Sequence, residues 1–198
     1  MNEPNGSKKI LVLGLAIGVL FAGCSPAPAP KVVKPGGLGV GDKAVDFSLL
    51  DANGHPMKLS DVQPGWSLVL FFYRGHWCEA CLNQMLNLKR DEPRFTELHA
   101  SLAAVSVDTV EDSAAWNKQW RFPFPLLADT RLELIKAYGA LDFKGHDSKD
   151  ISHPAVIIID SQKIVRFKYV GTKATDRPDD DEILYEVQKL QQTAGNAK

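Results

Sequence analysis

Two cysteines three residues apart are the residues best suited to chemistry in this sequence. They lie in the segment Gly75-His-Trp-Cys-Glu-Ala-Cys81, shortly after the apolar, aromatic run 67–73. A continuous apolar run of that length predicts a buried strand. Residues 78–90 carry apolar side chains at helical spacing, which predicts a helix. The cysteine pair is therefore expected where a strand turns into a helix.

Such a position favours a thiolate at Cys78. The free N–H groups and the dipole at a helix N-terminus stabilise an anion, and cysteines in such motifs have pKa values of about 3.5 to 7.5 instead of ~8.5. A thiolate is the nucleophile in both disulfide exchange and peroxide reduction. Because Cys81 is close enough to resolve a mixed disulfide or a sulfenic acid, the spacing predicts dithiol–disulfide chemistry.

Two structural uses of a cysteine pair are less well supported. Structural zinc needs four ligands, usually from two such pairs, and the further candidates here are scattered histidines: His55, His76, His99, His146 and His153. A purely structural disulfide across so short a loop removes little chain entropy. We therefore expect redox chemistry without a bound metal or cofactor.

The N-terminus has the features of a targeting signal. Lys8 and Lys9 precede an apolar run at 10–22, which is followed by Gly23 and Cys24. A positive start, a short apolar stretch and small residues before a cut are typical of a secretory signal, and the run is shorter than the roughly 20 residues that span a bilayer. Leu20-Phe-Ala-Gly-Cys24 resembles the lipobox of bacterial lipoproteins. We predict a signal peptide at 1–23, a lipid on Cys24 and a bacterial envelope location; the alternative is an uncleaved N-terminal anchor.

The rest of the chain reads as a tether followed by one domain. Residues 24–41 are rich in proline and glycine, which predicts an extended, flexible segment, and residues 42–198 are expected to form the domain. Hydrophobic residues make up 44% and charged residues 24%, which argues against disorder and against a multi-span membrane protein. A net charge of -1 without a basic stripe argues against nucleic-acid binding.

Patterns along the domain predict alternating strands and helices. Further strands are expected at 102–107, 155–159 and 164–170, the last two as a hairpin, and further helices at 110–120, 132–138 and 179–192. Pro93 is expected to end or kink the helix that begins at Cys78. This order predicts an α/β fold with a central mixed β-sheet flanked by helices.

A series of short motifs runs from Gly41 to Leu190. They are Gly41-Asp-Lys-Ala-Val-Asp-Phe47, Phe72-Tyr-Arg-Gly-His-Trp-Cys-Glu-Ala-Cys81, Val105-Ser-Val-Asp108, Phe124-Pro-Leu-Leu-Ala-Asp129, Tyr138-Gly139, His153-Pro-Ala-Val-Ile-Ile-Ile-Asp160, Val170-Gly171 and Asp176-Arg-Pro178. With these motifs the stretch resembles the redoxin branch of the thioredoxin superfamily, which includes peroxiredoxins related to alkyl hydroperoxide reductase and membrane-anchored thiol-disulfide oxidoreductases. The resemblance implies a thioredoxin-like fold.

The resemblance leaves open which cysteine attacks. In thioredoxin-like reductases the first cysteine attacks and follows a tryptophan, as Cys78 follows Trp77 here. In peroxiredoxins a threonine stands at the place of Cys78, and the peroxidatic cysteine falls at Cys81. Pro154 resembles the cis-proline of thioredoxins. The arginine that activates the peroxidatic cysteine of peroxiredoxins would fall near Pro154, so it is missing from its usual place in this sequence. We therefore hypothesise that Arg74 supplies the positive charge instead. The alternative is that Arg74 is a surface arginine without a role in the chemistry.

These observations predict a peroxiredoxin-like thiol oxidoreductase that reduces hydroperoxides through a Cys78–Cys81 dithiol–disulfide cycle, with a thiol as electron donor. The alternative is a thioredoxin-like reductase of envelope protein disulfides, with Cys78 as nucleophile. A third reading is a metal- or haem-handling chaperone of the thioredoxin fold, in which His153 would serve as a further ligand.

Overall fold

The apolar run before the cysteine pair forms strand β3 (Ser67–Phe72), the centre of a sheet in a computed structural model that describes residues 36–195. All of its residues are buried, because neighbouring strands and two layers of helices surround it. Successive side chains of a strand point to opposite faces. Val69 and Phe71 accordingly face one hydrophobic cluster, and Leu68 and Leu70 face the other.

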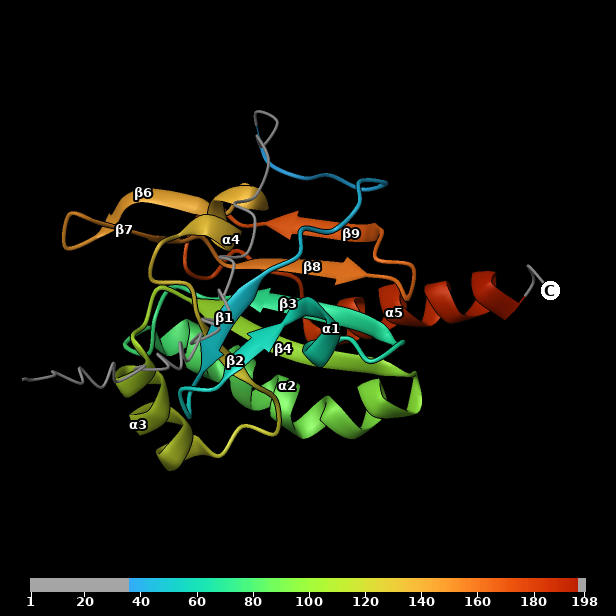
Figure 1. The fold of residues 1–198 in the computed structure, drawn as a ribbon, viewed down its shortest axis with the longest axis horizontal. Coiled ribbons are helices and arrows are strands. Elements are labelled where there is room, and N and C mark those ends of the chain that lie inside the picture. Colours follow the sequence, from blue (N-terminus) through green and yellow to red (C-terminus); the bar gives the residue numbers. More distant parts are fainter. Residues whose placement is uncertain (1–35, 196–198) are drawn as a thin grey trace, which may run out of the picture.

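The main sheet has seven strands in the order β2-β1-β5-β4-β3-β8-β9 (Figure 1). Strand β3 runs parallel to β4, and β4 runs parallel to β5, whereas the remaining pairs are antiparallel. The predicted mixed central sheet is therefore confirmed. Its other strands are β1 (Ser48–Asp51), β2 (Pro56–Lys58), β4 (Ala100–Ser106), β5 (Leu126–Ala128), β8 (Ala155–Ile159) and β9 (Val165–Val170).

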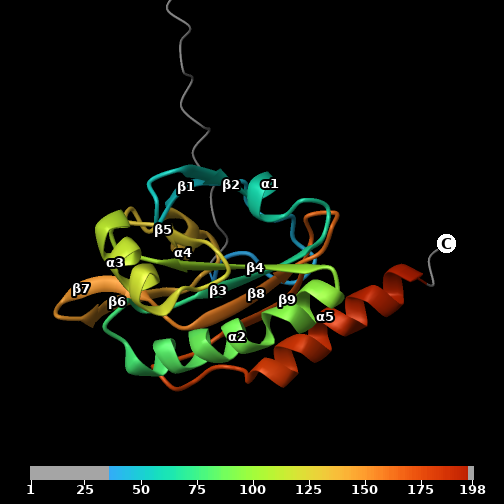
Figure 2. The same cartoon turned by 90° about the horizontal axis from the view of Figure 1, so that it is seen from below.

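Helices cover both faces of this sheet. The long helices α2 (Glu79–Glu97) and α5 (Asp180–Gly195) lie side by side on one face (Figure 2). The short helices α1 (Leu59–Val62) and α4 (Glu133–Ala137) pack into the hydrophobic cluster of the opposite face. Helix α3 (Val110–Trp120) has the predicted bounds and lies near β1 and β5. The predicted layer arrangement is confirmed.

Pro93 does not end α2, contrary to one of the two outcomes expected for it. The helix continues through Pro93 to Glu97. Proline inside a helix costs about 3 kcal/mol, but Phe95 in the following turn is fully buried, and burying such a side chain contributes about 1.5–3 kcal/mol. The packing of this turn into the core offsets much of the cost of the proline.

Several elements were not predicted. The most prominent is a separate two-stranded hairpin of β6 (Leu141–His146) and β7 (Lys149–Ser152), which projects from the body of the domain (Figure 1). Strands β1, β2 and β5 and helix α1 were also missed. Each has only 3 to 4 residues, which is too short for a periodic pattern to be distinguished.

The described part of the chain already contacts the domain before the predicted boundary at residue 42. The backbone N–H of Leu38 donates to the carbonyl of Ala137, and that of Gly41 donates to Val165. The predicted signal peptide, Cys24 and the tether up to residue 35 lie outside the described residues.

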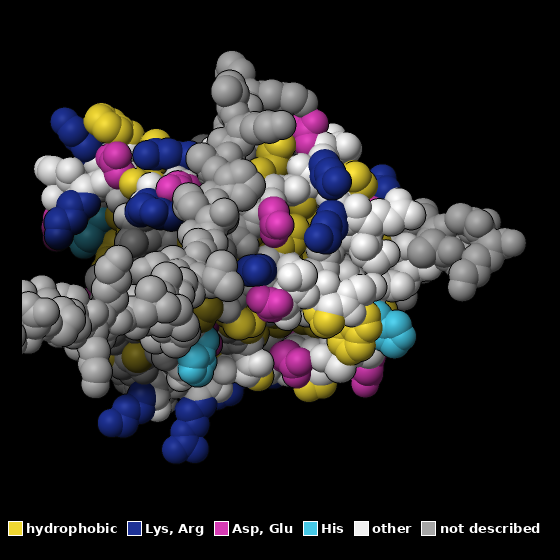
Figure 3. Space-filling view, in the orientation of Figure 1, with side chains coloured by type: hydrophobic (Ala, Val, Ile, Leu, Met, Phe, Trp, Pro, Cys, Tyr) yellow, Lys and Arg dark blue, Asp and Glu magenta, His cyan; other side chains and the backbone are white. Residues whose placement is uncertain are grey.

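The surface of the described residues has no large region of one charge on the face seen in Figure 3, where lysine and arginine side chains are interspersed with acidic ones on the part left visible. No helix within residues 36–195 combines the length and apolar character needed to cross a membrane.

Candidate active site

The two cysteines form a disulfide at the beginning of α2. Cys78 is the N-cap residue, with an extended backbone (φ -86°, ψ 105°), and Cys81 lies in the first turn. Their Cα atoms are 5.2 Å apart, within the usual range for a disulfide. The helix is intact around the bond, since the N–H of Leu82 donates to the carbonyl of Cys78 at 3.0 Å. The expected strand–turn–helix arrangement is present.

The turn before Cys78 is held by a buried carboxylate from the next strand. Asp108 follows β4 and is 5% exposed. Its Oδ2 accepts from the backbone N–H of His76 at 2.9 Å, and its Oδ1 lies 3.0 Å from Nδ1 of the same residue. Gly75 has a φ of +156°, and a Cβ there would overlap the ring of Trp77 and approach Asp108 Oδ1. The turn therefore requires glycine and is fixed by Asp108.

The sulfur of Cys78 is surrounded by local contacts. It accepts the backbone N–H of Cys81 at 3.3 Å, as an N-cap side chain does. Cys78 is 5% exposed, whereas Cys81 is fully buried. The helix N-terminus thus acts on the less buried of the two cysteines.

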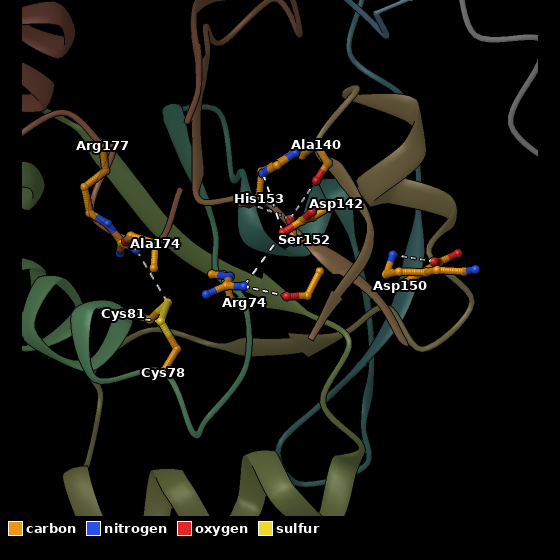
Figure 4. A network of polar contacts seen from close by, with 12 residues as sticks. Arg74, Cys78, Cys81, Ala140, Asp142, Asp150, Ser152, His153, Ala174 and Arg177 are labelled. Carbon is orange, nitrogen blue, oxygen red and sulfur yellow. Dashed lines mark hydrogen bonds and ion pairs between the residues drawn. A yellow bond between two sulfur atoms is a disulfide. The ribbon is translucent and has the colours of Figure 1, made fainter. Parts of the chain in front are cut away.

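The sulfur of Cys81 faces an arginine from a distant part of the chain. Nη2 of Arg177 lies 3.6 Å from Cys81 Sγ, and Figure 4 shows this side chain extending toward the disulfide. Nη2 also donates to the carbonyl of Ala174. The guanidinium carbon is 6.0 Å from the centroid of the Phe71 ring. A cation is therefore placed against Cys81.

Gln84, one helical turn after Cys81, fixes this arginine. Its Oε1 accepts from Nη1 of Arg177 at 3.0 Å, and its Nε2 donates to the carbonyl of Pro178 at 2.9 Å. Gln84 is 6% exposed. Both the oxygen and the nitrogen of this buried amide therefore have a hydrogen-bond partner. The amide connects the helix of the cysteine pair to the backbone that carries the arginine.

The charge on Arg177 lies in an unfavourable place. Burial, and secondarily the positive charge of Arg74, lower the pKa of Arg177 to about 10. The side chain is nevertheless protonated near neutral pH. A guanidinium that is partly desolvated and close to a second cation must be held in position by other contacts.

Arg177 was not identified from the sequence as a neighbour of Cys81. The motif Asp176-Arg-Pro178 contributed to the resemblance, but no function was assigned to it. Arg177 is 96 residues from Cys81, and no local pattern connects the two. The motif Asp176-Arg-Pro178 was the one signal in the sequence that could have identified this residue.

Arg74, the arginine proposed from the sequence, points to the β6–β7 hairpin. Its Nη2 donates to the carbonyl of Gly145 at 2.9 Å and lies 3.8 Å from Asp142 Oδ2 (Figure 4). Its guanidinium carbon is 5.3 Å from the centroid of the Trp77 ring. Arg74 thus connects the cysteine loop to the hairpin, and its effect on a cysteine stays a prediction.

Pro154 does not have the expected cis bond. None of the peptide bonds among residues 36–195 is cis, so the prediction taken from thioredoxins is wrong in this respect. Pro154 immediately precedes β8, and its carbonyl accepts the N–H of Gly171 at 2.8 Å. The trans form of an X–Pro bond is favoured by about 0.5–1 kcal/mol, and it suits a chain that enters a strand directly.

The remaining side chains near the site are aromatic, imidazole or acidic. Trp77 is 38% exposed and stacks on His146 of the hairpin, with 3.6 Å between ring centroids. His153 Nδ1 is 3.8 Å from Asp142 Oδ2. No group of three or more histidine, cysteine or acidic residues among residues 36–195 has an arrangement that could hold a metal ion.

A family model and several known proteins match most of this chain. The model of the family described as AhpC/TSA matches residues 40–168. Peroxiredoxin-6 of Rattus norvegicus is 30% identical over 174 residues, which cover 82% of this chain and 77% of that protein. Peroxiredoxin 2 of Thermoplasma acidophilum is 29% identical over 158 residues, which cover 77% and 76%.

Solved structures also resemble this one. Peroxidoxin BcpB from Mycobacterium tuberculosis superposes with a TM-score of 0.68 at 26% identity, covering 76% of this chain and 97% of that one. A cysteine-to-serine mutant of peroxiredoxin 6 from Arenicola marina gives a TM-score of 0.74 at 24% identity, covering 80% and 76%. The latter similarity concerns the fold.

Proposed function

Because this chain belongs to the AhpC/TSA family, we propose that Cys81 attacks the hydroperoxide and that Cys78 resolves the product. The chain is a peroxiredoxin-like, thiol-dependent oxidoreductase. The observation that carries the assignment of the sulfurs is the guanidinium of Arg177, 3.6 Å from Cys81 Sγ. A fixed cation favours a thiolate over a thiol, and it is placed at Cys81.

In the first step the reduced Cys81 thiolate attacks one oxygen of the hydroperoxide. A sulfur–oxygen bond forms and the oxygen–oxygen bond breaks, which leaves a sulfenic acid and an alkoxide or hydroxide that takes up a proton. Negative charge develops on the departing oxygen. Nη2 of Arg177 lies against the attacking sulfur, and the guanidinium would stabilise that charge as it forms.

In the second step the Cys78 thiolate attacks the sulfenic sulfur of Cys81. The disulfide forms and hydroxide leaves, taking up a proton to give water. The two cysteines lie within one turn of α2, and the helix is intact in the disulfide state described above. Resolution therefore requires little movement of the backbone.

In the third step a donor thiol regenerates the pair. The donor thiolate attacks Cys78, the less buried cysteine, and Cys81 leaves as a thiolate beside Arg177. A thiolate that is stabilised in this way is the better leaving group. A second donor thiol then attacks the mixed disulfide and releases reduced Cys78, so that two electrons and two protons enter in total.

The assignment is tested by replacing each cysteine alone. Hydrogen peroxide should convert Cys81 to a sulfenic acid in the Cys78→Ser protein, detected by mass spectrometry after trapping with dimedone. The Cys81→Ser protein should give no trapped sulfenic acid at Cys78 on the same timescale. The opposite labelling would show that Cys78 is the attacking sulfur.

A second function, the reduction of protein disulfides by Cys78, is favoured by one observation. Cys78 is the N-cap of α2, accepts the N–H of Cys81 and is the less buried cysteine. The trans bond before Pro154 removes one feature that the thioredoxin comparison had suggested. Insulin-disulfide reduction, with mixed disulfides trapped on Cys78 in the Cys81→Ser protein, would demonstrate this activity.

We also propose that the protein is anchored to the bacterial envelope through a lipid on Cys24. The support is the basic start, the apolar run at 10–22 and the lipobox-like segment that ends at Cys24. Multiple acyl chains would give stable anchoring, at about 0.8 kcal/mol for each buried CH₂.

The anchor is tested in a bacterial host with a radiolabelled fatty acid. The full chain and its Cys78→Ser variant should both incorporate label and partition into detergent, whereas Cys24→Ser should do neither. Equal labelling of Cys24→Ser would refute the assignment.

A further inference from the structure

The residue that precedes the site arginine is an aspartate whose carboxylate is fully engaged elsewhere. Oδ1 of Asp176 accepts from the hydroxyl of Tyr169. Oδ2 accepts from both the backbone N–H and the Oγ1 of Thr172, at 2.7 and 2.9 Å. These hydrogen bonds lower the pKa of Asp176 to about 2. The carboxylate is therefore ionised at neutral pH, and both of its oxygens are engaged by Tyr169 and Thr172.

The three residues close a loop between β9 and α5. Tyr169 is in β9, paired with Val156 of β8, so one end of the contact is on the rigid sheet. The N–H of Asp176 donates to the carbonyl of Lys173 at 2.9 Å. A Cβ at Gly171 would overlap the carbonyl oxygen of Asp176, so the two ends of the loop touch.

The closed loop is continuous with the contact to the sulfur. Nη2 of Arg177 donates to the carbonyl of Ala174 inside the loop and lies 3.6 Å from Cys81 Sγ. The same nitrogen thus contacts both the loop backbone and the sulfur. If the loop opened, the carbonyl of Ala174 and the backbone of Arg177 would move together.

A freed Asp176 would also compete for the arginine. Burial and Arg74 both disfavour the charge of Arg177 at its present position, and a neighbouring carboxylate would be a stronger partner than a carbonyl or an amide. The other charged groups that act on Tyr169 and Asp176 are Glu182 and Lys173. Engagement of both carboxylate oxygens keeps this competition away from the site.

We propose that Tyr169, Thr172 and Asp176 are positioning residues for the peroxidase reaction: they close the loop that directs Arg177 at Cys81 and keep the Asp176 carboxylate from pairing with it. The inference rests on the role of Arg177 given under the proposed function. None of the three residues touches the disulfide in the contacts described above.

The test uses the full chain with Cys24→Ser and Cys78→Ser, so that Cys81 is the single thiol. Two quantities are measured: the pH midpoint of the reaction of Cys81 with iodoacetamide, and the rate of its oxidation by hydrogen peroxide at pH 7. Tyr169→Phe should raise the midpoint and slow the oxidation on the order of tenfold, comparable to losing a hydrogen bond to a charged group. At a pH where Cys81 is fully ionised in both proteins, the alkylation rates should agree.

Thr172 provides a second, conservative comparison that does not depend on Tyr169→Phe folding. Thr172→Val loses the hydroxyl that donates to Asp176, and it should raise the midpoint, whereas Thr172→Ser keeps the hydroxyl and should restore it. Tyr185→Phe is the matched control, since Tyr185 is a 60% exposed tyrosine on α5. It should behave as the parent protein. A variant that is only less stable to heat would not change the pH midpoint. It would also not produce a difference between Thr172→Ser and Thr172→Val.

The outcomes separate the inference from the proposed function. If Arg177→Met raises the midpoint but Tyr169→Phe and Thr172→Val do not, the positioning role is wrong and the role of Arg177 stands. If Arg177→Met leaves the midpoint and the oxidation rate unchanged, the assigned role of Arg177 is wrong, and the positioning role is overturned with it. Equal effects of Tyr185→Phe and Tyr169→Phe would also overturn the positioning role.

Discussion

The two sulfurs of the disulfide lie three residues apart, yet their surroundings are built at different levels of the structure. Cys78 is surrounded by its own turn: it caps α2 and accepts the N–H of Cys81. Cys81 faces Arg177 and, one helical turn along α2, Gln84, which meet only because a loop after β9 returns to the helix. The contacts of one sulfur therefore come from local structure and those of the other from tertiary structure, and substitutions should affect the two separately.

The largest expected effect is on the Cys81 side. Arg177→Met removes the only guanidinium whose contact with a sulfur is found among the described residues, and it should slow peroxide oxidation of Cys81 by roughly 100-fold, since hydrogen bonds to charged groups contribute about 1.5–3 kcal/mol. Arg177→Lys keeps the positive charge, so the oxidation rate of Cys81 should fall less than in Arg177→Met. Stopped-flow oxidation of the Cys78→Ser protein measures both. Equal rates for parent and Arg177→Met would contradict the comparison.

Gln84→Leu tests the amide that holds the arginine. The substitution keeps a similar volume in a buried position but leaves Nη1 of Arg177 and the carbonyl of Pro178 without their partner. Oxidation of Cys81 should slow by about tenfold. Asn83→Leu, at the adjacent exposed position on α2, is the control and should stay within about twofold of the parent. A normal rate for Gln84→Leu would show that the loop alone suffices.

Asp108→Asn tests the Cys78 side. The amide oxygen can still accept the N–H of His76, but the charge that holds the imidazole is lost. We expect the disulfide-forming step to slow by roughly threefold to tenfold. The turn that contains Cys78 loses stabilisation equal to about one hydrogen bond. The rate of sulfenic acid formation at Cys81 should be unchanged. Rapid quenching after peroxide addition measures the two steps separately. A slower formation of the sulfenic acid at Cys81 would contradict the claim that substitutions affect the two sulfurs separately.

The smallest effect is expected for Arg74→Gln. Arg74 contacts the hairpin and opposes the charge of Arg177, so its removal should change the oxidation rate of Cys81 by about twofold to threefold at low salt. High salt should reduce the difference, because screening weakens interactions between separated charges. Lys149→Gln, an exposed change in β7, serves as the matched control. A loss as large as that of Arg177→Met would assign the activating charge to Arg74.

Part of this site was predictable because local patterns determine it. The run at 67–73 predicted the central strand, the cysteine spacing predicted the pair on the first turn of α2, and helix α3 was placed with its observed bounds. Pro93 does not end the helix, one of the two outcomes expected for it, because Phe95 in the next turn is buried in the packed core. The β6–β7 hairpin was missed because a short, half-exposed strand pair has no clear alternation.

The sequence by itself determined the chemistry: two cysteines at the start of a helix, followed along the chain by the motifs of a redoxin. Those features depend on residues close in sequence, whose spacing sets their geometry. Tertiary structure alone decided which arginine lies against Cys81, because Arg177 is held by Gln84 of α2 and belongs to the loop after β9, in which Gly171 meets the carbonyl of Asp176. It also decided that the bond before Pro154 is trans. No local pattern encodes contacts across 96 residues, since they follow from how the sheet and its helices pack.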